Sequence, residues 1–134
     1  MSDFTLHSRL AVDTIFVADR LLCRVLLMND VRYPWLVLVP RVADAVEIFD
    51  LSVQDRATLV EEIAEAARTL QQLSGAAKMN IGALGNLVPQ LHIHIVARKP
   101  GDPAWPGPVW GHSPAVPYTP DALDIFLAKL VNAR

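Results

Sequence analysis

Residues 90–96 read QLHIHIV, a run in which polar and apolar side chains alternate before two apolar residues end it. Alternate side chains of a β-strand project to the same face. A strand here therefore carries Gln90, His92 and His94 on one face, at a spacing of about 6.6 Å, while the leucine and isoleucines between them face the core. We expect the two imidazoles to point outward, because a slip of one residue would turn both of them into the core.

Two alternatives to a catalytic role are open for this histidine pair. One is that the solvent-facing side of a half-exposed strand simply carries two imidazoles. The other is a metal site, since His-x-His on a strand supplies two ligands, but a stable site needs a third ligand and usually a carboxylate behind it. His7, Cys23 or His112 would have to supply that ligand from elsewhere in the chain. We therefore predict that no metal is bound.

The rest of the sheet is predicted from short apolar segments. Strands are expected over residues 14–17, 23–27, 35–39, 78–84 and 91–97. The first two are separated by a short charged segment, which indicates a hairpin, and a polar loop over residues 29–34 follows them. Residues 35–39 are apolar at every position, which is typical of a central strand covered on both faces. The last two strands are joined by a turn around Gly85 and Asn86.

The pattern between these strands predicts a long helix over residues 53–73. Ser52 followed by Asp55 is typical of a helix start, and Gly75 suits a helix end. The side chains of its apolar stripe are Leu59, Val60, Ile63, Ala67 and Leu70. Such a stripe predicts a helix that packs one side on the sheet.

Both ends of the chain also carry helix signals. Residues 4–10 predict a short helix or turn capped by Ser2 or Asp3. Thr119 before a proline predicts the start of a last helix over about residues 120–133. The order of elements predicts a single α+β domain over the whole chain, with an antiparallel sheet of about five strands on which the long helix and the C-terminal helix pack.

Composition excludes several classes of protein. The chain has 134 residues, 52% hydrophobic and 19% charged, which is enough apolar material for one core and excludes general disorder. A net charge of -2 without a basic run argues against duplex nucleic acid as a partner.

The sequence also bears on the compartment. The apolar runs are too short to span a membrane, and the N-terminus lacks a signal-peptide pattern. Because Cys23 is the single cysteine, which fits a reducing compartment, we expect a cytoplasmic protein.

Taken together, the QLHIHIV run and the order of elements resemble the histidine triad superfamily of nucleotide hydrolases and transferases. The family signature alternates His-apolar-His-apolar-His and ends with two apolar residues, and residues 91–96 match it at every position. The likeness covers nearly the whole chain: a hairpin, an apolar strand that ends in Pro40, a long helix, and two strands with the signature on the second. The resemblance implies that the chain has the α+β fold of this family. It also implies that the ligand is a nucleotide or nucleotide conjugate and that no cofactor is needed.

The resemblance also implies roles for individual residues. His92 matches the central histidine, which attacks the α-phosphorus and forms a covalent nucleotidyl-imidazole. His94 matches the last histidine, which contacts the phosphoryl oxygens. Asn29 resembles a residue that contacts the ribose, and Asn80 and Asn86 resemble amides on the phosphate side. Asparagine is also common in turns and at strand ends for structural reasons alone.

Two positions depart from the family pattern. Gln90 replaces the first histidine of the triad, and Trp35 stands where a histidine commonly opens the third strand. A glutamine can orient a phosphate or a neighbouring backbone but cannot act as an acid or base. We expect the two replacements to be adjusted to each other.

A proline-rich arm over residues 100–118 follows the histidine strand. We expect its Trp105 and Trp110 to cover a pocket, a partner subunit or the sheet.

These implications give three hypotheses about function. The first is a nucleotide phosphohydrolase or nucleotidyl transferase that acts at the α-phosphate through His92. The second is a nucleotide-binding sensor or interaction module with little or no turnover, motivated by Gln90 and Trp35. The third is a metal-binding protein. The resemblance alone implies a homodimer.

Overall fold

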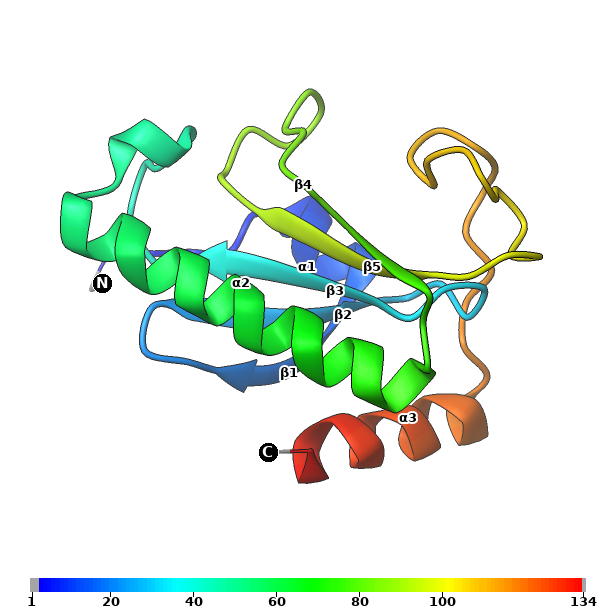
Figure 1. Ribbon diagram of the computed structural model, residues 1–134. Coiled ribbons are helices and arrows are strands. Elements are labelled where there is room, and N and C mark those ends of the chain that lie inside the picture. Colours follow the sequence, from blue (N-terminus) through cyan, green and yellow to red (C-terminus); the bar gives the residue numbers. More distant parts are fainter. Residues whose placement is uncertain (1–2, 134) are drawn as a thin grey trace.

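The computed structural model describes residues 3–133 and has an α+β architecture (Figure 1). Within this range, five strands form one antiparallel sheet in the order β1-β2-β3-β5-β4. Their bounds are Thr14–Asp19 (β1), Cys23–Met28 (β2), Trp35–Pro40 (β3), Lys78–Gly82 (β4) and Ile93–Arg98 (β5). The helices are Ser8–Asp13 (α1), Val53–Ser74 (α2) and Pro120–Asn132 (α3), with a short 3-10 helix at Ile48–Asp50. The predicted fold class and order of elements are confirmed.

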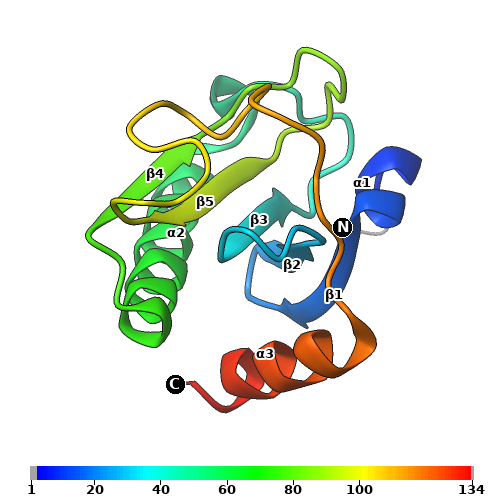
Figure 2. The same cartoon turned by 90° about the vertical axis from the view of Figure 1, so that its right-hand side faces the viewer.

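The sheet has α2 and α3 against one face and α1 against the other (Figures 1 and 2), and a hydrophobic layer lies on each side of it. The first layer joins one face of the sheet to α2 and α3, through side chains such as Leu70 and Leu130. The second layer joins the other face to α1 and the arm, through Leu10 and Val109. β3 lies between both layers and is buried along its whole length, as expected for a central strand. In the described part of the chain, no helix has the length and apolarity needed to cross a membrane.

The ends of α2 are the predicted ones. The Ser52 hydroxyl accepts a hydrogen bond from the Asp55 N–H at 3.0 Å, and Gly75 ends the helix in the left-handed conformation with φ of 68°. The predicted apolar stripe of α2 was wrong at one residue, which is exposed and not buried. Val60 is 61% exposed, whereas Glu62 is 8% exposed. A buried carboxylate in this position needs hydrogen-bond partners.

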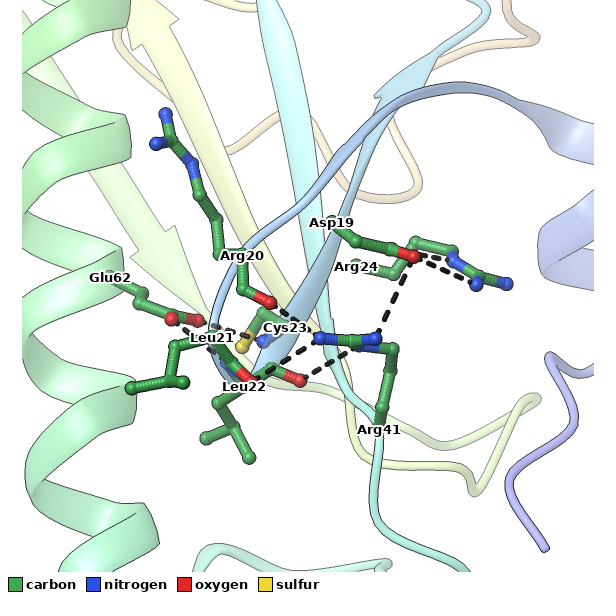
Figure 3. Close-up of polar contacts among 8 residues, drawn as sticks. All are labelled: Asp19, Arg20, Leu21, Leu22, Cys23, Arg24, Arg41 and Glu62. Carbon is green, nitrogen blue, oxygen red and sulfur yellow. Dashed lines mark hydrogen bonds and ion pairs between the residues drawn. The ribbon is translucent and has the colours of Figure 1, made fainter. Parts of the chain in front are cut away.

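Figure 3 shows the partners of Glu62. Its carboxylate accepts hydrogen bonds from the backbone N–H groups of Leu22 at 3.0 Å and Cys23 at 2.8 Å. On the other side of the same turn, the Arg41 guanidinium donates to the backbone carbonyls of Arg20, Leu21 and Leu22. The β1–β2 turn is therefore held from both sides. Burial, with a contribution from Glu62, raises the pKa of the Cys23 thiol, so this cysteine stays protonated and is a poor metal ligand.

The N-terminal helix differs from the prediction. It begins at Ser8 rather than near Phe4. Its cap is His7, whose Nδ1 accepts a hydrogen bond from the Arg9 N–H at 3.0 Å, and not Asp3. Ser2, the other predicted cap, lies outside the described residues. Histidine is not among the favoured N-cap residues, which is why the sequence pattern pointed to the earlier positions.

The histidine strand also starts later than predicted. β5 begins at Ile93, and a loop over residues 83–92 connects it to β4 in place of a tight turn. The Leu91 N–H donates to the carbonyl of Ala45 at 2.9 Å instead of to a sheet neighbour, and Pro89 has no N–H to donate. The loop therefore stands away from the sheet, where it can form the wall of a cavity.

Candidate functional site

A cavity of about 550 Å³ lies on the face of the sheet that α1 and the arm cover. Besides the sheet, which contributes Trp35 and His94, four parts of the chain line it: α1, the loop after β2, the loop over residues 83–92 and the arm. His92 and His94 both belong to the lining. Most of the other lining side chains are apolar, among them Leu10, Met28, Leu84, Leu87, Val88, Val109 and Trp110. A largely apolar cavity with a few polar groups is the usual form of a small-molecule site.

His92 is 6% exposed, and the chain just before it holds its ring. Nδ1 lies 2.7 Å from the backbone carbonyl oxygen of Gln90. A carbonyl oxygen only accepts hydrogen bonds, so Nδ1 carries the proton of the neutral ring. Nε2 therefore keeps a free lone pair. This tautomer gives His92 a nucleophilic nitrogen.

His94 is 7% exposed and lies between two tryptophans. Its Nδ1 accepts a hydrogen bond from Trp35 Nε1 at 3.0 Å. Its ring lies edge-on to Trp35 and to Trp110, with 5.6 Å between ring centroids in each case. Burial, followed by the neighbouring His92, lowers the pKa of His94 to about 4. The ring is therefore neutral at pH 7.

The prediction that both imidazoles point outward needs a correction. They lie on the predicted face of the strand, since Ile93 and Ile95 belong to the layer under α2 and α3. That face is not exposed to solvent, however, because the arm and the loop over residues 83–92 cover it. The reading of the pair as an incidental solvent-facing feature is therefore wrong.

Gln90, predicted to share the site, is engaged elsewhere. Its Oε1 accepts a hydrogen bond from the His7 N–H at 2.8 Å, and its Nε2 donates to the Thr5 carbonyl at 2.9 Å. It does not line the cavity. Gln90 thus joins the N-terminal segment to the histidine strand and positions α1, which forms one cavity wall. Trp35 bonds to His94 instead, so the two replacements have different partners and their adjustment to each other stays a prediction.

We expect Gln90→Ala to lower the free energy of unfolding by roughly 1–2 kcal/mol, because two backbone groups of the N-terminal segment lose their partner. Hydrogen exchange should also become faster at Ala11 of α1, whose N–H bonds to the carbonyl of the cap residue His7. Urea unfolding and exchange measured by NMR test both effects. Gln90→Glu is the matched variant, since it keeps the acceptor for His7 and loses the donor to Thr5. Unchanged exchange at Ala11 would contradict this role.

The three asparagines predicted to bind substrate occupy different places. Asn86 lines the cavity. Asn29 accepts a hydrogen bond from the Tyr118 N–H at 3.0 Å, and Asn80 accepts one from Arg98 at 2.8 Å; neither belongs to the cavity lining. The structure therefore places Asn86 in the lining of the same cavity as the histidine pair and leaves Asn29 and Asn80 as supports of the arm.

Sequence reasoning missed the charged residues of the cavity. Arg9 and Asp13 of α1 pair at 3.6 Å, and Arg32 pairs with Asp30 at 2.9 Å; all four line the cavity. Burial acts to raise the pKa of Asp30, but hydrogen bonds from Arg32 outweigh it and hold that pKa below its usual value. The spacing of Arg9 and Asp13, four residues apart in the sequence, could have predicted this ion pair on a helix.

The arm that covers the histidines is anchored by a buried ion pair. Arg98 is 1% exposed and donates to both carboxylate oxygens of Asp102, at 2.8 and 3.0 Å. Its guanidinium also lies over the rings of Tyr33 and Trp105, 5.8 Å from each centroid. Farther along the arm, Trp110 packs against Gly82, where an added Cβ would approach the indole to 3.3 Å. The arm is thus held at two points, by the ion pair at Asp102 and by the packing of Trp110.

Asp102→Asn is expected to lower the free energy of unfolding by about 3 kcal/mol, because it leaves a buried guanidinium without its counter-charge. The Arg98 hydrogen bond lowers the pKa of Asp102 from its ordinary 3.8. The stabilisation is therefore complete above pH 3.8 and is lost as the pH falls through the lowered value. Thermal unfolding against pH should show the two proteins converging in acid. Asp124→Asn, an exposed change in α3, is the control; an equal loss there would contradict the assignment.

Residues 3–133 contain no group of three His, Cys, Asp or Glu side chains arranged to hold a metal ion. Comparison with known proteins gives a direct indication of the family. The model of the HIT domain matches residues 9–101, a range that runs from α1 through the histidine pair to the start of the arm. A comparison with curated proteins finds no match.

Three solved structures are similar to the chain over nearly its whole length. A histidine triad protein from Sinorhizobium meliloti is 47% identical, with a TM-score of 0.97 over 100% of this chain and 99% of that one. One from Bradyrhizobium japonicum is 49% identical, with a TM-score of 0.93 over 95% of each chain. One from Marinobacter aquaeolei is 50% identical, with a TM-score of 0.93 over 95% of this chain and 93% of that one.

Proposed function

Since this chain belongs to the histidine triad (HIT) family, we propose that it hydrolyses or transfers nucleotides at the α-phosphate through a covalent intermediate on His92. The single observation that carries the proposal is the 2.7 Å distance between Nδ1 of His92 and the Gln90 carbonyl oxygen, which favours a proton on Nδ1 because a carbonyl only accepts. The nitrogen left for a ligand in the cavity is Nε2, with its lone pair free.

The first step forms a bond between Nε2 and the α-phosphorus. The bond from phosphorus to the leaving group breaks, and the leaving group departs with the electron pair. The ring of His92 then bears a positive charge, which the Gln90 carbonyl, 2.7 Å from Nδ1, stabilises. In the second step water attacks the phosphorus, the N–P bond breaks, and the imidazole returns to its neutral form as a proton passes to solvent. A different acceptor in place of water makes the reaction a transfer.

The other residues of the cavity bind and orient the nucleotide. His94 contacts the phosphoryl oxygens, where negative charge develops. Asn86, at the edge of the cavity, offers an amide to the phosphate side. Asn29 and Asn80 act indirectly, since their hydrogen bonds to Tyr118 and Arg98 hold the arm over the site.

A trapped intermediate tests the proposal. The protein is incubated with nucleoside phosphoramidates and dinucleoside polyphosphates, quenched, and examined by intact mass spectrometry. We expect a mass increase of one nucleotidyl group, mapped to the peptide that contains His92. Turnover without any adduct on His92 would contradict the covalent mechanism.

One observation favours the sensor alternative. Gln90 is fully engaged with the N-terminal segment, so the cavity holds two imidazoles where the family signature has three. A protein with this site could bind a nucleotide and release it unchanged. Calorimetry separates the two functions: saturable binding of a nucleotide with neither an adduct nor product would establish the sensor. The homodimer and the cytoplasmic location implied by the sequence stay predictions.

A further inference from the structure

Trp35, the first residue of β3, is 8% exposed and makes one directional contact in the site. Its Nε1–H donates to Nδ1 of His94 at 3.0 Å. An indole nitrogen is a donor and never an acceptor, so the direction of this bond is fixed. Nδ1 of His94 must accept, and a nitrogen that accepts carries no proton. The proton of the neutral ring therefore sits on Nε2.

The surroundings of His94 favour the same state. The groups packed around it are Trp35 from β3, Trp110 from the arm, His92 from the end of the loop before β5, and Gly82, its partner in β4. His92 is the titratable group among them, and a charge on it would oppose a charge on His94. Burial and this repulsion lower the pKa of His94 to about 4. A doubly protonated ring, moreover, would have no acceptor for the indole.

We propose that Trp35 is a positioning residue that locks His94 as the Nε2–H tautomer, a neutral hydrogen-bond donor to the phosphoryl oxygens. This inference rests on the proposed function of the site. The two histidines are then held in opposite tautomers, His92 by a carbonyl and His94 by an indole. The Nε2 of one attacks phosphorus, while the Nε2 of the other donates to an oxygen of the same phosphoryl group.

The hydrogen bond from Trp35 to His94 also keeps the two imidazoles from exchanging their parts as nucleophile and hydrogen-bond donor. Their ring centroids are 4.9 Å apart, so a proton could in principle move between two free imidazoles at this distance. The indole of Trp35 does not titrate and cannot take a proton from Nδ1 of His94. Reversal of the tautomer would leave two N–H groups facing each other in a buried place, at a cost of about 1–3 kcal/mol or more.

A purely structural role for Trp35 makes a different prediction. Trp35 also packs edge-on against Tyr33, with ring centroids 6.3 Å apart, so it fills space in the second hydrophobic layer. If space filling were its whole role, phenylalanine would serve with a small loss of packing and the tautomer of His94 would not change. Trp35→Phe therefore separates the donor from the aromatic bulk.

The test begins with the unaltered protein and needs no substrate. In ¹⁵N NMR spectra of the free protein at pH 7, we expect His94 Nδ1 to have the shift of an unprotonated nitrogen and His92 Nδ1 that of a protonated one. A scalar coupling across the hydrogen bond should join Trp35 Nε1 to His94 Nδ1. Protonation of His94 at Nδ1, or rapid averaging of its two tautomers, would overturn the proposal.

Two variants complete the test. Trp35→Phe should give mixed tautomers at His94 and lower kcat by roughly 10-fold to 100-fold, as expected for a misplaced donor to the developing charge. Trp35→His should restore the single tautomer only in part: Nε2 of histidine and Nε1 of tryptophan hold equivalent places in their five-membered rings, but an imidazole nitrogen can accept as well as donate. An unchanged tautomer in Trp35→Phe would overturn the lock. Absence of a nucleotidyl adduct with the tautomers intact would instead contradict the proposed function.

Discussion

Replacement of His92 by alanine is expected to lower turnover of every nucleotide substrate by roughly 10⁴-fold or more, the effect of removing a covalent nucleophile. The reason is specific to this site. In the proposed arrangement, Nε2 of His92 is the ring nitrogen left with a free lone pair, since Nδ1 of His94 is occupied by Trp35 and Nδ1 of His92 by a carbonyl. Steady-state kinetics together with the intact mass of the quenched protein measure the loss of both product and adduct.

The control for this prediction must allow for burial. Because His92 is 6% exposed, alanine leaves a small cavity and a backbone carbonyl without its donor, so part of the effect could come from altered structure. His92→Asn removes the nucleophile but places an amide N–H where Nδ1–H was, and keeps the bond to the Gln90 carbonyl. We expect His92→Asn to unfold within a few degrees of the unaltered protein and to be equally inactive. More than a few per cent of residual activity in a folded His92→Asn would rule out attack by this residue.

Most of the fold could be predicted because its signals are local. Ser52 and Gly75 end α2 by contacts within one turn, and an apolar run bounded by prolines predicts β3 without knowledge of its neighbours. The prediction fails where the environment of a residue depends on a distant part of the chain. Val60 and Glu62 exchange their expected environments, because the Glu62 carboxylate has partners in the β1–β2 turn that no pattern within the helix reveals.

The sequence pointed to His92, His94 and Asn86, which line the cavity, but not to the environment around them. Alternation along residues 90–96 placed both imidazoles on the correct face, but the cover over that face comes from an irregular arm with no periodicity to read. Gln90 finds its partners 83 and 85 residues away. Such long-range contacts between a side chain and a backbone leave no local pattern, so its role as a link to α1 could not be read from its place in the signature.

The second large effect that we expect is on the rate with different leaving groups, and it follows from the acidic groups that line the cavity. A general acid contributes roughly 10²–10⁴-fold when its pKa lies near the working pH. Of the groups that line the cavity, His94 has a pKa of about 4, Asp30 is held ionised by Arg32, and Asp13 pairs with Arg9. His94 and Asp30 are therefore not suited to protonate a departing group at neutral pH. In the proposed mechanism, the leaving group is accordingly expected to depart without a proton from either of them.

We accordingly expect the rate of nucleotidyl transfer to His92 to fall steeply as the leaving group becomes more basic. In a series of aryl esters of one nucleoside monophosphate, kcat/KM should drop by roughly 10²–10⁴-fold from the most acidic to the least acidic phenol, the range that a general acid would otherwise supply. Every ester forms the same intermediate on His92, so the rate of its hydrolysis, measured after the burst, is the internal control and should be constant. A shallow dependence of kcat/KM would show that a group in the cavity does deliver a proton.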